Sequence, residues 1–444
     1  MKRLLLAMLM LGLMTVFSTT AFAADVKFSG HFYAAGMYVD KTDLRKDYGN
    51  STAFYFQRLR VQTDFIVSPS LKLVTRFDAM ERAWGAPRSA ADTALDIDSA
   101  GTIAENENIA IDWAYINYKS PIGVFDVGIM NDGSTGTIFG NSTAPAGRIK
   151  YSYTMAPFTL NLAYTKVRER SHTAKLASNF TDADNDKYGI EGVYRWKDGL
   201  AAVQVNYYHY RANRPGAPLT GNYRGIYYLV TPYTIVKIGP VKLQAELNYA
   251  FGKIKDYEDA TSDVKLRELS GWIDALADFG MFYAGGTFAY VSGNKPETTK
   301  QEGGQLSGGR DWNPCLILFS YYDTYYWAGA IEGWDVSPTS ATGDVNNVMK
   351  NAFFYQGRVG VRPISNLDIM ASLAYAVAER KPAGYLEKDY GMEFDLTATY
   401  KITNNLSYML GAGYLWTGDY FKYDNAAHKV SDNYMIINKL TLTF

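Results

Sequence analysis

Cysteine and histidine are both scarce in this chain of 444 residues, which has one cysteine and four histidines. The single Cys315 excludes a disulfide within the chain, and its simplest interpretation is a small buried hydrophobic residue. No histidine falls in a zinc-site spacing, and no local motif pairs a histidine with a nucleophile. We therefore expect no metal, no cofactor and no enzymatic activity. The four histidines are His31, His172, His209 and His428.

An excess of positive charge is also lacking, because 44 lysines and arginines face 45 aspartates and glutamates. Proteins that bind nucleic acid present a basic patch or stripe. We therefore expect no nucleic-acid partner.

The N-terminus has the three parts of an export signal. Lys2 and Arg3 are followed by an uncharged apolar stretch over 4–17, and the small residues Ala21 and Ala23 flank Phe22. This pattern predicts a signal peptide over residues 1–23, cleaved after Ala23, and removal of the two basic residues takes the net charge to −3. The alternative, a retained membrane anchor, is disfavoured because the apolar stretch is short for a bilayer.

Long apolar runs are absent after residue 23, which excludes a transmembrane helix there. Aromatic residues nevertheless make up 15% of the chain, with 36 tyrosines, and no linker or low-complexity tract divides it. Residues 24–444 are therefore expected to form one continuous architecture.

What the chain does have is strict alternation of polar and apolar residues. In the segment 58–65 the even positions are polar and most odd positions apolar, and the pattern resumes over 71–78 after a turn at Ser68-Pro69. Successive side chains of a strand point to opposite faces, so this period of two predicts strands with one polar face.

Short turns alternate with longer polar segments along the chain. Eight short turns pair sixteen strands, and terminal strands near 26–39 and 432–444 bring the number to about 18. The turns are Ser68-Pro69, Ser120-Pro121, Ala156-Pro157, Lys197-Asp198-Gly199, Gly239-Pro240, Asp278, Pro363 to Asn366, and Thr403 to Asn405. Short turns at one end, long loops at the other and an even strand number are typical of outer-membrane barrels.

A strand-built protein crosses a bilayer only as a sheet without edges, because hydrocarbon offers no partner to free backbone groups. The predicted fold class is therefore all-β: a transmembrane antiparallel β-barrel of about 18 strands with a long inserted loop, located in the outer membrane of a Gram-negative cell.

Charged side chains in such a barrel have to face the lumen, because a lysine or arginine facing lipid at mid-depth costs about 2–4 kcal/mol. The first tight hairpin, numbered with Val67 facing Leu71, puts Arg60 opposite Asp78 and Gln62 opposite Arg76. This charged row either favours anions or is a wall of mutually satisfied charges. The pore-lining candidates are Arg58, Arg60, Gln62, Asp64, Lys72, Arg76, Asp78 and Arg82.

Aromatic residues near strand ends are expected to form the girdles at the two membrane interfaces. The chain also ends in an alternating apolar strand whose last residues, Leu440, Leu442 and Phe444, resemble the signal read by the barrel-insertion machinery. The girdle candidates are Trp113, Tyr115, Trp196, Tyr207, Trp272, Tyr414 and Trp416.

The segment 292–348 has no clear membrane strand but is rich in large rings, which an exposed loop has no reason to carry. We expect it to fold into the barrel as a constriction loop. The alternative is an extra strand over 321–332 with a hidden partner, giving about 20 strands. The constriction candidates are Trp312, Phe319, Tyr321, Tyr325 and Trp327.

Asp182, Asp184 and Asp186 alternate as in a calcium loop, but Lys187 stands where the loop needs glycine and Val193 where it needs glutamate. We interpret this segment as a solvated acidic loop.

The chain resembles the alginate-export-type group of Gram-negative porins. The resemblance is carried by the hairpin from Arg58-Leu59-Arg60 to Arg76-Phe77, by the segment from Asp112 to Ile116, and by Val127-Gly128-Ile129 leading to Gly140. It implies an 18-stranded channel with an occluding loop and does not imply alginate as the substrate. In that group a strand commonly reads Gly-Arg with the arginine entering the lumen, whereas Ile129 holds that place here.

The expected function is passive diffusion of small hydrophilic solutes or ions. The alternative is a structural or adhesion barrel with a closed lumen and partner-binding loops. Expected partners are outer-membrane lipid and lipopolysaccharide, the barrel-insertion machinery and the solutes themselves, with the chain as a monomer or homotrimer.

Overall fold

The computed structural model describes residues 25–85, 109–133, 136–169, 183–211, 221–295, 299–336 and 343–444. The expected signal peptide and Asp182 lie outside these residues. No helix in the described ranges combines the length and the apolar character that a membrane crossing requires.

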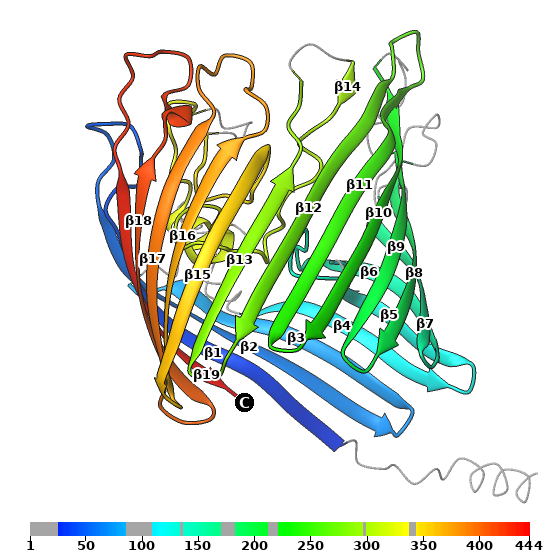
Figure 1. The fold of residues 1–444 in the computed structure, drawn as a ribbon. Helices are drawn as coiled ribbons and strands as arrows, with labels where there is room; N and C mark the ends of the chain where they lie inside the picture. The colour runs from blue at the N-terminus through cyan, green and yellow to red at the C-terminus, as the bar shows by residue number, and fades with distance from the viewer. Residues whose placement is uncertain are drawn as a thin grey trace, which may run out of the picture.

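Eighteen long strands form a single antiparallel sheet, and each pairs with its neighbours in the chain (Figure 1). They are β1 (Asp25–Val39), β2 (Thr52–Ser68), β3 (Leu71–Ala83), β4 (Ile109–Ser120), β5 (Gly123–Asn131), β6 (Pro145–Met155), β7 (Phe158–Arg168), β8 (Asn185–Trp196), β9 (Gly199–Tyr210), β10 (Tyr223–Ile238), β11 (Val241–Tyr257), β12 (Val264–Asp278), β13 (Phe282–Val291), β15 (Ala352–Ile364), β16 (Leu367–Ala378), β17 (Asp389–Lys401), β18 (Leu406–Thr417) and β19 (Asn433–Thr443). The short β14 (Lys300–Gln301) pairs in parallel with the start of β12 and is not part of the wall. Three short helical turns complete the elements of the described residues: η2 (Tyr321–Tyr325), α2 (Tyr326–Ala328) and η3 (Asp419–Lys422).

The sheet closes because the first and last strands pair. β1 runs antiparallel to β19 from His31 opposite Thr443 to Val39 opposite Met435. At the lower end of this seam, the Gly30 N–H donates to the Phe444 carbonyl at 2.8 Å and the Phe444 N–H donates to the Gly30 carbonyl at 3.0 Å. The predicted barrel of about 18 strands is confirmed.

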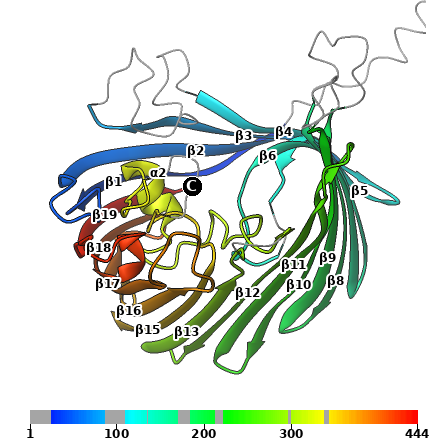
Figure 2. The same cartoon turned by 90° about the horizontal axis from the view of Figure 1, so that it is seen from above.

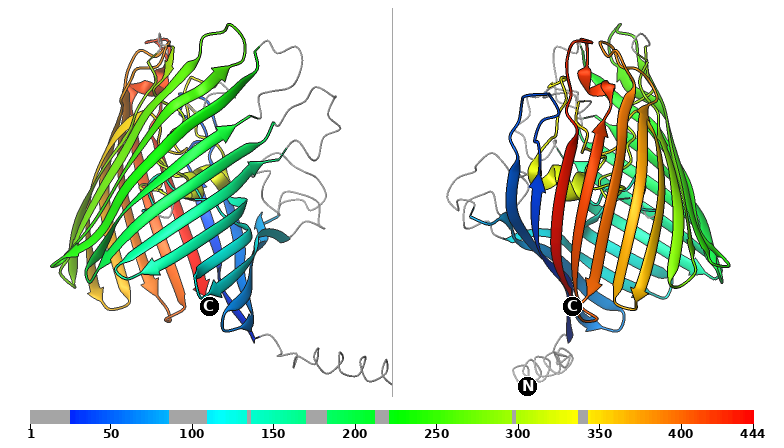
Figure 3. Two further views of the ribbon diagram at one scale, coloured as in Figure 1. Left: turned by 90° about the vertical axis from the view of Figure 1, so that its right-hand side faces the viewer. Right: turned by 60° about the vertical axis from the view of Figure 1, so that its left-hand side comes forward.

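All eight predicted turns connect consecutive strands at one end of the barrel, where the C-terminus also lies (Figure 1). The longer connections that the structure describes lie at the other end or inside. Figure 3 shows how steeply the strands tilt, as barrel closure requires.

The two faces of the wall differ as the alternation predicts. On β4, Ile116 and Tyr118 are exposed, while Asn117 between them donates a hydrogen bond to Asp126 at 2.6 Å. Large apolar residues are exposed in the same way on strands around the barrel, which gives the outward face the character that lipid requires.

Most of the described residues in the segment between β14 and β15 lie inside the ring of strands, on the side of β15–β19 (Figure 2). Most of the buried hydrophobic core lies between this segment and the inner faces of β1, β2 and β15–β19. The predicted inserted loop is therefore confirmed. The alternative strand over 321–332 is not formed, because residues 321–328 are helical and Glu332 makes only isolated bridges.

Candidate functional site: the lumenal cavity and the inserted segments

The inward face of β2 is identified by its contact with the inserted segment. Phe56 stacks on Trp327 of α2, with ring centroids 4.3 Å apart. Arg58, Arg60 and Gln62 follow at alternate positions of the same strand and therefore share that face.

The register of the first hairpin agrees with prediction, with Arg60 opposite Asp78 and Gln62 opposite Arg76. The Arg60 guanidinium donates two hydrogen bonds of 2.6 Å to the two Asp78 carboxylate oxygens, a bidentate pairing. Val67 does not face Leu71, because a register shift at the turn pairs Ser68 with Leu71 instead.

Every charged candidate on the lower part of this face has an opposite charge within reach. The Lys72 ammonium lies 2.6 Å from an Asp64 carboxylate oxygen, and the Gln62 amide donates to the same carboxylate at 3.1 Å. Arg76 donates to Asp112 of β4 at 2.8 and 3.1 Å. The row is thus a set of mutually satisfied charges in this structure.

Arg82 does not continue the row. Met80 adopts a positive φ of 52° and the register shifts beside it, so Arg82 opposes Gln57 on the other face of the sheet. Glu81 takes the inward position instead and accepts a hydrogen bond from Arg58 at 3.1 Å. A bulge of one residue reverses the faces of all residues beyond it, which alternation alone does not reveal.

A second bulge, at Asp112 on β4, corrects the expected girdles. Arg76 pairs with Trp113 while Phe77 pairs with Ile111, so Asp112 is the extra residue. Trp113 consequently faces inward, where the Arg76 guanidinium lies 3.5 Å from its ring centroid.

Tyr115 follows Trp113 on the same inward face, and Trp272 is also inward, buried against an inserted segment. These three are not girdle residues. The other four candidates lie on the outward face, either exposed themselves or stacked on exposed tyrosines: Trp196, Tyr207, Tyr414 and Trp416.

The inserted segment is held to the wall by buried carboxylates. Glu268 of β12 accepts the consecutive backbone N–H groups of Gln305–Leu306, at 2.8 and 2.6 Å. Glu393 of β17 accepts those of Ile317–Leu318, at 2.7 and 2.6 Å. Hydrogen bonds to a charged acceptor are the stronger kind, so each carboxylate fixes two residues of the segment.

A second segment between β5 and β6, described over residues 136–144, also turns inward. Thr137 donates to Glu246 of β11 through its hydroxyl at 2.6 Å and its backbone N–H at 3.1 Å. The fully buried Phe139 packs against Trp272 and Trp312, with centroids 6.0 and 5.3 Å apart. This insertion is not predictable from periodicity, because Gly, Asn, Ser and Thr dominate the segment and Phe139 is its one large aromatic residue.

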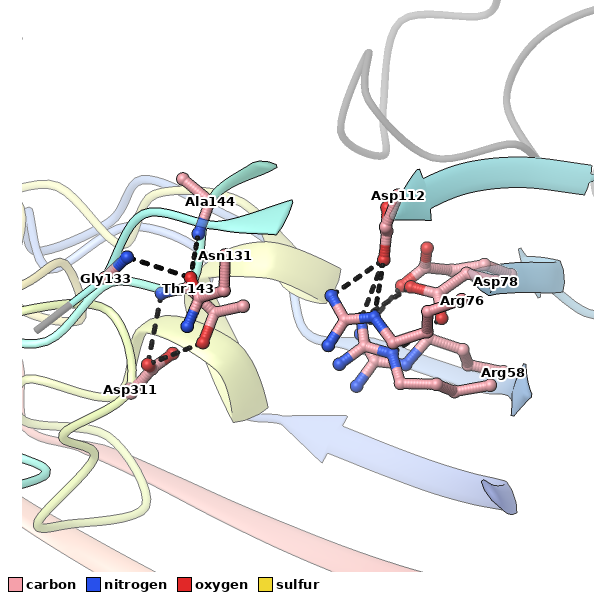
Figure 4. Close-up of polar contacts among 11 residues, drawn as sticks. Arg58, Arg76, Asp78, Asp112, Asn131, Gly133, Thr143, Ala144 and Asp311 are labelled. Atoms are coloured by element: carbon pink, nitrogen blue, oxygen red, sulfur yellow. Dashed lines mark hydrogen bonds and ion pairs between the residues drawn. The ribbon is translucent and has the colours of Figure 1, made fainter. Parts of the chain in front are cut away.

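Asp311 joins the two inserted segments (Figure 4). Its carboxylate accepts hydrogen bonds from the Thr143 backbone and hydroxyl at 3.1 and 3.0 Å, and from the Asn141 amide at 2.6 Å. The contact is close enough to require glycine at Gly309, which has φ +70° and whose added Cβ would lie 2.2 Å from the Asn141 carbonyl oxygen.

The predicted constriction residues lie in the inserted segment, but most of them pack against the wall. Trp312 and Phe319 contact Phe354 of β15, and Trp327 contacts Phe56. Tyr325 stacks on Tyr321, with centroids 5.2 Å apart.

Tyr321 also borders a cavity of about 610 Å³ between the inserted segments and the charged wall. The wall contributes three carboxylates and three arginines that pair with one another, and the inserted segments contribute Arg310, Asp311 and tyrosines. Figure 4 shows Arg58 and Arg76 on one side of this region and Asp311 on the other. The residues that line the cavity are Arg58, Arg60, Arg76, Asp78, Glu81, Ala110, Asp112, Thr143, Ala144, Pro145, Arg310, Asp311, Tyr321, Tyr322 and Tyr326.

The formal charge of the cavity is balanced, since four arginines face four carboxylates. Arg310 is the arginine among them without an ion pair in the described part of the chain; its guanidinium lies 5.0 Å from the Tyr321 ring centroid. Burial and then Asp311 raise the pKa of Tyr322 to about 12, so its hydroxyl stays neutral and able to donate.

A larger hollow of about 1070 Å³ lies across β6–β11, but its lining is almost wholly apolar. Met155, Phe158 and Ile190 are exposed there on the outward face. It belongs to the lipid-facing surface and is not a candidate solute site.

Of the acidic residues with calcium-like spacing, the two that the structure describes, Asp184 and Asp186, form ion pairs within the protein. The Lys166 ammonium lies 2.8 Å from Asp184 and 2.9 Å from Asp186, which places a protein cation between the two carboxylates.

No protein-family model matches the chain, and no curated protein sequence is similar to it. Solved structures from Pseudomonas aeruginosa match along almost its full length. OccK8 (OprE) has a TM-score of 0.53 and 11% identity, covering 95% of this chain and 98% of its own. The outer membrane protein opdK has a TM-score of 0.51 and 10% identity, covering 94% and 99%. OccK11 (OpdR) has a TM-score of 0.50 and 12% identity, covering 95% and 96%. The chain therefore has the fold of Gram-negative outer-membrane porins, an 18-stranded antiparallel barrel with inserted loops.

Proposed function

We propose that the protein is a passive channel of the Gram-negative outer membrane for small hydrophilic solutes or ions. One observation carries this proposal: the closed barrel encloses a polar cavity of about 610 Å³ whose walls are charged and whose exterior is apolar. Diffusion through such a cavity needs no catalytic residue and no cofactor.

The charge pattern supports a weak ion preference. Each of Arg58, Arg60 and Arg76 has a carboxylate within 3.1 Å, so little net field remains at the wall. A polyanion, the kind of solute that the name of the alginate-export-type group suggests, would have to compete with these carboxylates for the arginines. The resemblance to that group therefore stands as a hypothesis for the barrel layout, and small neutral or singly charged solutes fit the cavity better.

The outward face and the C-terminal strand of the barrel indicate which molecules surround and assemble the protein. The outward apolar face is suited to lipid and lipopolysaccharide, and the alternating C-terminal strand with Leu440, Leu442 and Phe444 is suited to the barrel-insertion machinery. The proposal holds equally for a monomer and for a homotrimer, because the cavity is enclosed by one chain.

The second candidate is a structural or adhesion barrel with a closed lumen. The observation that favours it is the firm attachment of the inserted segments, with Glu246, Glu268 and Glu393 all buried and hydrogen-bonded to them. A permanently fixed insert narrows the lumen or shuts it.

Reconstitution in planar bilayers separates the two functions. A channel gives stable single-channel steps, and a variant lacking residues 300–340 gives larger steps. A closed barrel is silent at all voltages and begins to conduct only in that deletion variant. Heat-denatured protein from the same preparation is the control for leakage caused by detergent.

A further inference from the structure

Three potential metal ligands meet where the inserted segment contacts the wall. Cys315 comes from the segment, and Glu393 and Asp395 are alternate residues of β17. All three are buried, with exposed fractions of 5%, 0% and 3%. One ligand atom from each, the thiol sulfur and two carboxylate oxygens, lies within 4.8 Å of the other two.

The two carboxylates have no positive partner. Glu393 accepts the backbone N–H groups of Ile317–Leu318 and Asp395 accepts the Ser372 hydroxyl at 3.4 Å, and no lysine or arginine forms an ion pair with either acid in the described ranges. The Oδ1 atom of Asp395 is buried without any hydrogen-bond partner. Two adjacent buried carboxylates without a counter-charge are costly, so this site needs a bound cation or a proton.

The space for a cation is kept open by a glycine. Gly413 of β18 lies directly opposite Asp395. A Cβ added there would lie 2.7 Å from the Asp395 Oδ1 atom and 3.2 Å from the Glu393 Oε1 atom. Any side chain at this position would therefore occupy the space between the unpartnered oxygen and the second carboxylate.

We propose that Cys315, Glu393 and Asp395 bind one divalent transition-metal ion of the zinc class, which fastens the inserted segment to the barrel wall. One sulfur and two carboxylate oxygens suit Zn²⁺, whereas Ca²⁺ and Mg²⁺ prefer ligand sets made only of oxygen. Ligand atoms around tetrahedral zinc are about 3.5 Å apart, so a small contraction of the cluster completes three of the four positions.

The thiol has to lose its proton when the metal binds. Burial, and then Glu393 and Asp395, raise the pKa of the Cys315 thiol well above its usual value. The metal-free protein therefore holds a neutral thiol, and the cation replaces that proton with a stronger positive charge beside the carboxylates.

The test uses the full mature chain folded in detergent, treated with a chelator and then dialysed against Co²⁺ or Zn²⁺. We expect one metal ion per chain by elemental analysis and a thiolate-to-Co²⁺ charge-transfer band. Cys315→Ser should abolish the band and weaken binding by at least about 100-fold, because losing a direct ligand costs more than the 10–100-fold typical of losing an outer-sphere partner. Serine is close in size to cysteine, so this variant keeps the fold.

Glu268→Gln is the matched control, because it removes a buried carboxylate that also holds the inserted segment but has no cysteine beside it. It should bind metal like the unmodified chain, while Glu393→Gln should not. Absence of bound metal at micromolar concentrations, or the same charge-transfer band in Cys315→Ser, would overturn the proposal and leave a proton shared between the two acids. Neither outcome depends on whether the barrel conducts.

Discussion

Trp327 of the inserted segment lies against Phe56 of β2, with ring centroids 4.3 Å apart and planes inclined by 28°. Glu268 and Glu393 hold the same segment at β12 and β17, so it is attached to three separate parts of the wall. Because the segment is attached at three places, we expect that losing one contact would loosen it without releasing it from the lumen.

Replacing Trp327 with alanine should loosen this segment without disturbing the barrel. Loss of a buried tryptophan costs about 3–5 kcal/mol, and here the cost falls on the attachment of the segment. We expect Trp327→Ala to conduct in larger and noisier single-channel steps. Trp416→Ala, on the outward face of β18, is the control and should leave conductance unchanged. Identical traces from both variants would show that the ring contact does not restrain the segment.

Glu268 should prove essential for the order of residues 305–306. Both backbone N–H groups donate to the Oε2 atom of Glu268, and the Gln305 N–H also reaches Oε1. Glutamine replaces these charged acceptors with one neutral oxygen and one amide donor, so the hydrogen bonds weaken at a cost of about 1–3 kcal/mol. Glu268→Gln should therefore accelerate hydrogen exchange at Gln305 and Leu306. Glu302→Gln is the control, because it removes a more exposed ion pair with Lys295 at 3.5 Å. It should change hydrogen exchange at Gln305 and Leu306 far less. Equal exchange in the two variants would rule out the carboxylate as the anchor.

The wall was predictable because lipid imposes one rule on every strand. Charged residues have to turn inward and apolar residues outward, so alternation and turn residues were sufficient to locate the strands and to pair Arg60 with Asp78. The rule fails only where one extra residue enters a strand. Met80 and Asp112 are such residues, and nothing in their identity signals a bulge. Arg82 and Trp113 were consequently assigned to the wrong faces.

The lumen was less predictable, because its contacts join residues far apart in the chain. Ring density indicated that the main segment folds inward, yet Trp312 and Phe319 pack on the wall more than they border the open space. From the alternation, Glu246 and Glu393 are predicted only to be polar residues that face inward. Their hydrogen-bond partners lie in loops 109 and 75–76 residues away in the sequence. Sequence periodicity carries no information about which loop meets which carboxylate.

Arg310 should set the ion preference of the cavity, because it is charged and lacks an ion pair among the described residues. One unit charge at 4 Å in water is worth about 1 kcal/mol, so its removal can change the cation-to-anion permeability ratio by about fivefold. We expect Arg310→Gln to shift the reversal potential in a salt gradient toward cations, and less so at high salt. Lys197→Gln changes the same charge in a turn outside the cavity and should have no effect.

Arg60→Gln should behave differently from Arg310→Gln, although the change in formal charge is the same. It leaves the buried Asp78 without its bidentate partner. Breaking a buried pair from one side costs about 3–5 kcal/mol, so this variant should lose heat resistance of the folded barrel as well as shifting selectivity. Full stability of Arg60→Gln in a gel-shift assay with heating would mean that water or another residue replaces the arginine.

Phe444 should contribute to assembly in two separable ways. Its backbone closes the β1–β19 seam through two hydrogen bonds with Gly30, and its ring belongs to the proposed insertion signal. Deleting Phe444 removes both, so we expect a strong loss of folded barrel in the outer-membrane fraction. Phe444→Tyr should retain most of it. Gly30→Val keeps the C-terminal residues but places a Cβ 2.1 Å from the Arg60 carbonyl oxygen of β2 and 3.1 Å from the Phe444 ring, so it should disturb β1 where the barrel closes. If Gly30→Val reaches the membrane but does not fold, while the deletion variant does not reach the membrane, then the seam and the signal have separate roles. Normal levels of folded protein in the deletion would show that neither role is needed.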